Sequence, residues 1–228
     1  MILKTAIIIA GGKGTRLEEK TEEIPKPLIK VAGVPLIERI ILWLKKEGVE
    51  NIILGVAYKK EMIKEYLGNG NSLGVNIYYT EHNENGGTED AFKLAVEKAS
   101  KLEDNFYAMN GDQLTDLPLK ELTKTHLMTG ALATIVTVNL KTEFGIVEVD
   151  KNKIISFREK GKVPNVLMNS GIYVFNKKIK DYLEGGNIEE NTFRKLARER
   201  KLYSFYYPGL WFTINNKKEL KKAEEYLK

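Results

Sequence analysis

The stretch Ala10-Gly11-Gly12-Lys13-Gly14-Thr15-Arg16-Leu17 directly follows an apolar run over residues 2–9 and decides how the chain folds. An apolar run without polar alternation is typical of a buried parallel strand, so the glycine-rich stretch is expected at the carboxyl end of that strand. Three glycines within four residues leave backbone N–H groups open to a ligand, as an anion cradle requires. The turn is therefore predicted to bind phosphate.

Two basic side chains near this stretch could hold the same anion. Arg16 offers a planar fork of donors, and Lys26, held between two prolines, adds a compact charge from the other side. The alternative is an ordinary glycine-rich turn between a strand and a helix, with both cations in solvent. A dinucleotide fingerprint is excluded because Leu17 stands where its third glycine belongs, and a P-loop is excluded because a glycine follows the loop lysine.

The composition is that of a globular protein, with 43% hydrophobic and 29% charged residues among 228. The net charge of +5 is spread along the chain, so it suits a polyanionic small substrate and does not indicate a nucleic-acid partner. No apolar run is long enough for a membrane span and no secretory leader is recognisable, which predicts a cytoplasmic protein without a membrane partner. The absence of cysteine excludes disulfides and thiolate chemistry.

The first half of the chain alternates apolar runs with helical patterns. Strands are expected at residues 2–9, 51–57, 75–80 and 105–110, and helices at 35–48, 59–67 and 88–100. This alternation predicts an α/β fold: a Rossmann-like, mostly parallel sheet flanked by helices, whose ligands bind beyond the carboxyl ends of the strands. The glycine-rich stretch and Asp112 would then lie on one rim of the sheet.

The second half is richer in β-structure. Closely spaced strands are expected at residues 131–139, 145–150, 154–158 and 166–175, which predicts a partly antiparallel extension of the sheet. A helix is expected at 193–200, and another follows Asn216, which can cap it with Glu219 in the capping-box position. Because no linker or internal repeat is present, residues 1–228 are expected to form a single domain. The two histidines, His82 and His126, are expected on the surface or in turns.

Asp112 is a candidate metal ligand on chemical grounds. It follows an Asn-Gly pair where an apolar run ends, and Mg²⁺ binds through one or two carboxylates together with substrate phosphates. The alternative at this position is a common Asx turn.

A second glycine turn, Gly86-Gly87, opens the helix expected at residues 88–100. Thr88 can cap this helix, and Glu89 and Asp90 are favourable in its first turn. Taken alone, this pattern indicates the start of a helix and no more.

The sequence Ala-Gly-Gly-x-Gly-Thr-Arg-Leu at 10–17, followed by Pro-Lys-Pro at 25–27, resembles the signature of the sugar-phosphate nucleotidyltransferases. The resemblance implies that the loop binds a nucleoside triphosphate. It implies that Arg16 and Lys26 assist the attack of a sugar 1-phosphate on the α-phosphorus, with pyrophosphate as the leaving group. It also implies Mg²⁺ as cofactor, with Asp112 as its ligand. The left-handed β-helix domain that some members carry after this domain is not expected here.

The residues that match the family's motifs are spread along the whole chain. The implied catalytic residues are Arg16, Lys26 and Asp112. The implied nucleotide-binding residues are Ala10, Gly11, Gly12, Gly14, Thr15 and Gly87. The implied substrate-binding residues are Asn110, Gly145, Glu159, Lys160 and Asn169.

Three positions depart from the family's pattern. Glu89 follows Gly-Thr where alanine is usual, and Gly161 replaces the proline that usually follows the family's Glu-Lys pair. Thr213 stands where the resemblance places a second metal carboxylate. Because a neutral hydroxyl cannot replace the charge of a carboxylate, we expect weak Mg²⁺ binding in the absence of nucleotide.

Two other functions stay open at this point. The acceptor could be a non-sugar phosphate, such as phosphocholine or a polyol phosphate, or the chain could bind nucleotide sugars without making them. The sequence identifies neither the nucleobase nor the acceptor, and it is compatible with a homo-oligomer.

Overall fold

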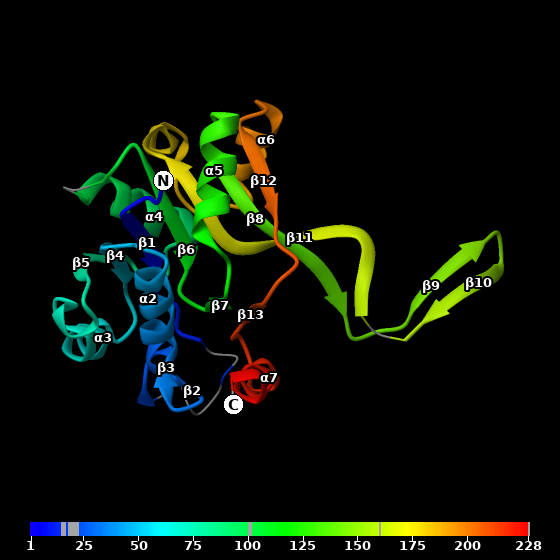
Figure 1. Ribbon diagram of the computed structural model, residues 1–228, viewed down its shortest axis with the longest axis horizontal. Helices are drawn as coiled ribbons and strands as arrows, with labels where there is room; N and C mark the ends of the chain where they lie inside the picture. The colour runs from blue at the N-terminus through cyan, green and yellow to red at the C-terminus, as the bar shows by residue number, and fades with distance from the viewer. Residues whose placement is uncertain (15–16, 18–22, 100–101, 160, 228) are drawn as a thin grey trace.

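A seven-stranded sheet runs through the body of the molecule (Figure 1). The structure is a computed structural model that describes residues 1–14, 17, 23–99, 102–159 and 161–227. In spatial order, the strands of this sheet are β12 (Leu202–Tyr206), β8 (Ala133–Thr142), β11 (Gly161–Asn176), β6 (Asn105–Asn110), β1 (Thr5–Ile9), β4 (Asn51–Val56) and β5 (Asn76–Glu81).

The remaining elements flank this sheet or extend it. Three small two-stranded sheets are formed by β2 (Lys30–Val31) with β3 (Val34–Pro35), β7 (Gln113–Thr115) with β13 (Trp211–Thr213), and β9 (Ile146–Asp150) with β10 (Lys153–Arg158). Among the described residues, the α-helices are α2 (Leu36–Lys46), α3 (Lys60–Leu67), α4 (Thr88–Lys98), α5 (Leu119–Thr129), α6 (Thr192–Arg198) and α7 (Lys217–Leu227). Short 3-10 helices are η2 (Lys26–Leu28), η3 (Asn71–Leu73) and η4 (Lys177–Tyr182).

The pairing of the strands confirms the predicted fold class. Strands β6, β1, β4 and β5 are parallel to one another, as the βαβ alternation requires. Strand β11 runs antiparallel to both β6 and β8, and β12 is parallel to β8. The first half of the chain therefore forms the parallel part of the sheet, and the second half forms its mixed extension.

Both faces of the sheet are covered by apolar side chains. Ala6 and Ile8 of β1 belong to one buried cluster, with residues of α2, α3 and α5, while Ile7 between them belongs to the opposite cluster, with residues of α4 and α6. Side chains of a strand alternate between its two faces, so a strand that is apolar throughout needs a core on each side. This burial explains why the run before the glycine-rich stretch has no polar alternation.

The helix boundaries follow local sequence signals. Helix α2 begins directly after Pro35, and its buried stripe is formed by Leu36, Ile37, Ile40, Ile41 and Leu44, as predicted. At α7, the Asn216 side chain accepts a hydrogen bond from Glu219 N, which confirms the predicted cap. At α4 the expected cap is wrong: Gly87 is the N-cap residue and Thr88 is the first residue of the helix.

Some elements were not expected from the sequence, among them a helix and an edge strand. Helix α5 lies between β7 and β8, and β12 forms the edge of the large sheet. His126 of α5 is 1% exposed, so its expected surface position is wrong. Its ring nitrogens contact Thr134 Oγ1 at 2.9 Å and Asn105 Oδ1 at 3.0 Å, which satisfies the imidazole inside the core.

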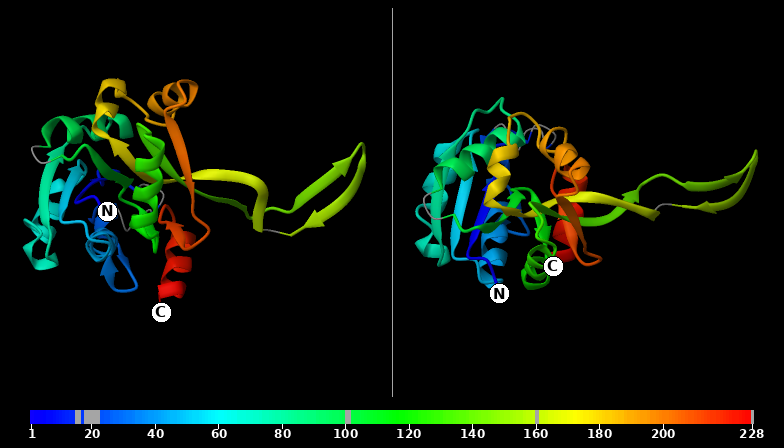
Figure 2. Two further views of the ribbon diagram at one scale, coloured as in Figure 1. Left: turned by 45° about the horizontal axis from the view of Figure 1, so that its top comes forward. Right: turned by 90° about the horizontal axis from the view of Figure 1, so that it is seen from above.

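The hairpin of β9 and β10 projects from one end of the body, and it keeps this position in every view (Figures 1 and 2). Among the described residues, no helix has the length and apolar character needed to cross a membrane.

We predict that His126 makes stability depend on pH between 7 and 5. Burial lowers the pKa of His126 from its usual 6.5 to about 4, so the unfolded chain takes up a proton in this interval and the folded chain does not. Stability is therefore lost as the pH falls, by about 1 to 2 kcal/mol for this residue. Urea unfolding at both pH values should show a smaller loss in His126→Gln than in the unaltered chain, and equal losses would contradict the assignment.

Candidate active site

A cavity of about 200 Å³ lies beyond the carboxyl ends of β1 and β6. It is lined by Ile9, Ala10, Gly12, Lys26, Pro27, Thr88, Asn110, Gly111 and Asp112. The parallel β1–β6 pairing sets Ile9 beside Asn110, and Gly111 N donates to Ile9 O at 2.8 Å. The topology therefore brings the glycine-rich stretch and the Asn-Gly-Asp turn together on one rim, as predicted.

Lys26 is the charged centre of this cavity. Its Nζ donates to Asp112 Oδ2 at 2.6 Å and to Asn215 Oδ1 at 2.9 Å. The side chains of Lys26 and Asp112 are only 12% and 22% exposed, so water weakens their ion pair less than it does on an open surface. Lys26 opens η2 between two prolines, which hold its backbone while the side chain reaches into the cavity.

A set of hydrogen bonds holds the two oxygen partners of Lys26 in place. Gln113 Nε2 donates to Asp112 Oδ1, and Ile214 N donates to the backbone oxygen of Asp112 at 3.0 Å. Asn215 Nδ2 donates to Thr213 Oγ1 at 2.7 Å, and Asn215 N donates to a carboxylate oxygen of Glu219 at 2.7 Å. The start of α7 is thereby tied to the end of β6.

The donor set of this network suits a hard divalent cation. The oxygens of Asp112 and Asn215 converge on one positive group, the ammonium of Lys26, and carboxylate and amide oxygens are ligands that Mg²⁺ accepts. Within the described ranges, no group of three or more His, Asp or Glu side chains could hold a metal. Any cation bound here would therefore need further ligands from water or from a bound phosphate.

Asn215 is the functional candidate that sequence reasoning missed. The family pattern directs attention to Thr213, yet here Thr213 contacts Asn215, and it is Asn215 that contacts Lys26. The signal available in the sequence was the amide side chain of Asn215 itself, which lies two residues after Thr213 and directly before Asn216, the cap of α7. Position in the family's motif alone could not reveal it.

The three glycines of the glycine-rich stretch have different roles. Gly14 has a φ of 67°, which favours glycine. A Cβ on Gly11 would lie 2.3 Å from the ring of His82, so this position requires a residue without a side chain. Around Gly12, by contrast, a Cβ would meet no atom within 4 Å, and this residue lines the cavity. Thr15 and Arg16, which the resemblance makes functional, lie outside the described residues.

The start of α4 forms a second wall and is tied to a segment about 100 residues later. Asp90 Oδ2 accepts hydrogen bonds from Gly87 N at 2.8 Å and from Gly186 N at 3.1 Å. The fully buried Glu89 accepts from Glu184 N at 2.7 Å and from Thr192 Oγ1 at 2.8 Å. Glu89, a departure from the family's pattern, thus contacts the protein and not the cavity.

The structure brings five of the fourteen predicted site residues together at the cavity. Residues of the predicted set that line the cavity are Ala10, Gly12, Lys26, Asn110 and Asp112. Asn169 lies at an irregularity of β11, where its Nδ2 donates to the Tyr173 hydroxyl at 3.0 Å and its Oδ1 accepts from Gly171 N at 2.9 Å. A Cβ on Gly171 would come 3.0 Å from Asn110 Nδ2, so this irregularity lies beside the cavity.

Two predicted substrate-binding residues lie elsewhere. Gly145 and Glu159 flank the projecting β9–β10 hairpin, and neither lines the cavity. Lys160 lies outside the described residues.

The sequence matches the Nucleotidyl transferase family over residues 5–227, so the chain belongs to this family. Within this family, the chain is similar to sugar-phosphate nucleotidyltransferases. It is 31% identical to D-glycero-alpha-D-manno-heptose 1-phosphate guanylyltransferase from Aneurinibacillus thermoaerophilus, over 97% of each chain. It is 35% identical to mannose-1-phosphate guanyltransferase from Saccharomyces cerevisiae, over 93% of this chain and 62% of that relative. The chain thus spans about three fifths of the length of several curated relatives it matches.

Solved structures show the same architecture. HddC from Yersinia pseudotuberculosis is 27% identical, with a TM-score of 0.78 over 99% of this chain and 100% of its own. The same protein complexed with GMP-PN has a TM-score of 0.75 over the same shares. A UDP-glucose pyrophosphorylase complexed with UDP-glucose, at 18% identity, has a TM-score of 0.77 over 100% and 98% of the two chains. The fold is that of the nucleotide-diphospho-sugar transferases.

We predict that Gly12 and Gly87 differ sharply in their tolerance of a methyl group. A Cβ on Gly87 would lie 1.7 Å from the backbone oxygen of Gly186, whereas a Cβ on Gly12 meets open space. Gly87→Ala should therefore destabilise the fold by about 3 kcal/mol, the upper end of the usual cost of overpacking, because the backbone cannot move as a side chain can. Gly12→Ala is the control and should change stability by less than about 1 kcal/mol, within the range for a position without new contacts. Chemical unfolding of both variants measures the difference, and equal stabilities would refute it.

Proposed function

We propose that this chain transfers a nucleotidyl group from a nucleoside triphosphate to a sugar 1-phosphate, giving a nucleoside-diphosphate sugar and pyrophosphate. The observation that carries the proposal is the placement of Lys26 and Asp112 across one cavity from the glycine-rich stretch. Backbone N–H groups and a largely buried ammonium suit a triphosphate, and the carboxylate suits its accompanying cation. Membership of the nucleotidyl transferase family supports the same reaction.

In this reaction, an oxygen of the sugar phosphate attacks the α-phosphorus while the bond from that phosphorus to the bridging β-phosphate oxygen breaks. The substrate phosphate is already a nucleophile, so the protein supplies position and charge compensation and forms no covalent intermediate. Lys26 would exchange its bond to Asp112 for a phosphate oxygen when the nucleotide binds. Arg16 is proposed to bind the triphosphate from the glycine-rich stretch.

Mg²⁺ is proposed as the cofactor, with Asp112 and Asn215 as its protein ligands. When bound, it would compensate negative charge on the phosphates. With a single carboxylate among these ligands, the protein should hold the cation weakly until the nucleotide contributes its own oxygens.

GTP and a D-manno-configured sugar 1-phosphate are proposed as the first substrates to test. Support comes from the names of relatives at 31% and 35% identity, which are guanylyltransferases of a heptose 1-phosphate and of mannose 1-phosphate. A non-sugar phosphate acceptor and a purely sensing role are the alternatives that a broad screen must separate.

We predict pyrophosphate release in a screen of the common triphosphates against mannose, glucose and heptose 1-phosphates, phosphocholine and polyol phosphates. Lys26→Met and Arg16→Ala should each lower turnover by at least about a hundredfold, as expected when charge compensation in the transition state is lost. Lys30→Met is the matched control, since Lys30 is exposed and lies outside the cavity, and it should leave turnover within about twofold. If pyrophosphate is released only with a non-sugar phosphate, that phosphate replaces the sugar 1-phosphate as the proposed acceptor. If no pair of substrates gives pyrophosphate, the sensing role is favoured.

A further prediction concerns the cation. Mn²⁺ binding, measured by electron paramagnetic resonance, should be weak without nucleotide and at least about tenfold tighter with GTP, because phosphate oxygens complete the ligand set. Asn215→Ala should weaken Mn²⁺ binding in the presence of GTP, and Thr213→Asp should strengthen it and lower the Mg²⁺ needed for turnover. A tight site in the nucleotide-free protein would contradict this ligand set, and turnover that EDTA does not affect would remove Asp112 from the mechanism.

A further inference from the structure

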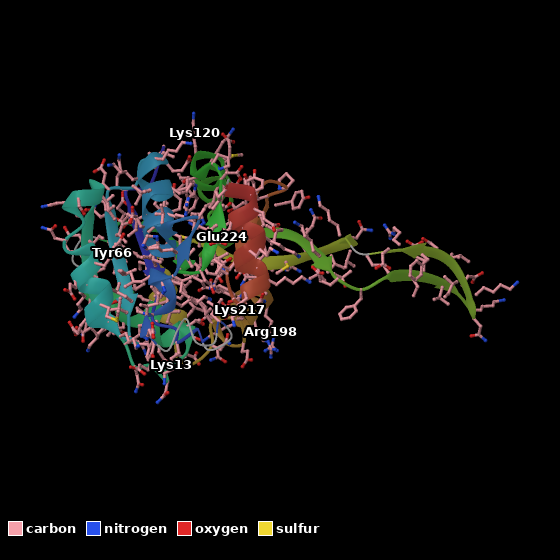
Figure 3. All side chains as sticks on the ribbon, turned by 90° about the horizontal axis from the view of Figure 1, so that it is seen from below. Lys13, Tyr66, Lys120, Arg198, Lys217 and Glu224 are labelled. Carbon is pink, nitrogen blue, oxygen red and sulfur yellow. The ribbon has the colours of Figure 1, made fainter. Side chains whose placement is uncertain are left out.

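The β9–β10 hairpin, here called the arm (residues 144–159), stands apart from the rest of the molecule. Figures 1 and 2 show it beyond the ends of β8 and β11, and Figure 3 shows its side chains extending away from the ribbon, with no other element beside them. In the described part of the chain, β9 and β10 form ladders only with each other. A two-stranded hairpin alone is marginally stable in water, so the arm needs a further contact.

The strand register sorts the arm's side chains onto two different faces. Directly paired residues of antiparallel strands share a face. Two such pairs form one wholly apolar face, and its members are Val147, Val149, Ile154 and Phe157. The other face is mostly polar and carries an ion pair of 2.9 Å between Arg158 and Glu148. The arm is therefore amphipathic, in the pattern of a ribbon that buries one side.

The apolar face is open to solvent in the single chain. Its four side chains are 45%, 55%, 63% and 63% exposed in chain order, and Phe144 at the root of the arm is 81% exposed. Contiguous apolar surface of this kind marks an interaction site in a soluble protein. A hairpin that stays fully solvated would carry polar side chains on both faces, and this one does not.

Contacts with the body of the molecule hold both ends of the arm, so that it projects outward. Glu143 accepts hydrogen bonds from Lys218 and Lys222 of α7, at 2.7 and 2.8 Å, and these two cations lower the pKa of Glu143 to about 2. On the other side, Gly161 of β11 pairs with Thr142 of β8. A Cβ on Gly145 would lie 2.8 Å from the Phe157 ring, so the ring packs closely on the backbone at the root.

We propose that the arm's apolar face packs against the same face of a second copy of this chain, across a two-fold axis. The face is complementary to itself, since each copy presents the same four aliphatic and aromatic side chains to the other. The arm carries three acidic residues and three basic ones, so two arms can meet without repulsion although the whole chain has a net charge of +5. The acidic residues are Glu148, Asp150 and Glu159, and the basic ones are Lys151, Lys153 and Arg158.

The exposed apolar area of the arm is that of a small interface. The four side chains of the apolar face expose on the order of 400 Å² per copy, about half of the roughly 800 Å² per partner of a standard-size interface. With Phe144 and Ile155 added, the six large apolar side chains of the arm expose on the order of 700 Å² per copy. They are Phe144, Val147, Val149, Ile154, Ile155 and Phe157. The inference rests on this surface alone and is independent of the proposed reaction.

Sedimentation velocity of the full chain tests the proposal. The unaltered chain should form a dimer with a Kd in the micromolar range or tighter. Ile154→Lys places a charge on the apolar face and should weaken association at least tenfold. Ser156→Lys adds the same charge on the polar face and should leave the dimer intact. Circular dichroism melts of both variants verify that the body stays folded.

A second measurement identifies the contacting face directly. Because the chain contains no cysteine, Val149→Cys and Ser156→Cys each introduce a single thiol. With copper phenanthroline as oxidant, Val149→Cys should give a disulfide-linked dimer and Ser156→Cys should not. A chain that stays monomeric up to about 100 μM would overturn the proposal. A dimer that Ile154→Lys does not weaken would overturn it as well.

Discussion

The ammonium group of Lys26 holds together the end of the sheet where the cavity lies. Its two oxygen partners belong to Asp112 and Asn215, which are 86 and 189 residues away in the chain. A largely buried charge needs such partners, because water can no longer solvate it fully. The strand ends, η2 and the segment before α7 therefore meet at one positive charge, and the cavity has its shape because they do.

Much of the parallel half of the fold could be predicted from the sequence. Strands β1, β4 and β6 are apolar runs that need two cores, and α2 is bounded by Pro35 and Gly48. These signals are local and strong, and the βαβ alternation then places Asp112 beside the glycine-rich stretch without further information. Five predicted site residues line the cavity for this reason.

The rest depends on contacts between distant segments, which local patterns do not contain. Asn215 is placed by its bonds to Lys26 and Glu219, and Gly87 by its contact with Gly186. The arm was recognised as two strands, but its direction is decided by the long β8–β11 ladder and by two lysines of α7. His126 was misplaced because its burial depends on polar partners in β6 and β8.

The carboxylates of Glu89 and Asp90 couple two distant segments of the chain in local unfolding. Both bind backbone N–H groups of the segment from Glu184 to Gly186, and Glu89 is itself buried. The first turn of α4 cannot unwind without breaking these bonds and exposing a buried carboxylate. The two segments therefore form one unit in local unfolding, and their amide hydrogens should exchange with solvent together although 95 residues separate Glu89 from Glu184. The resistance of this cavity wall to local unfolding therefore depends on the segment from Glu184 to Gly186, which does not line the cavity.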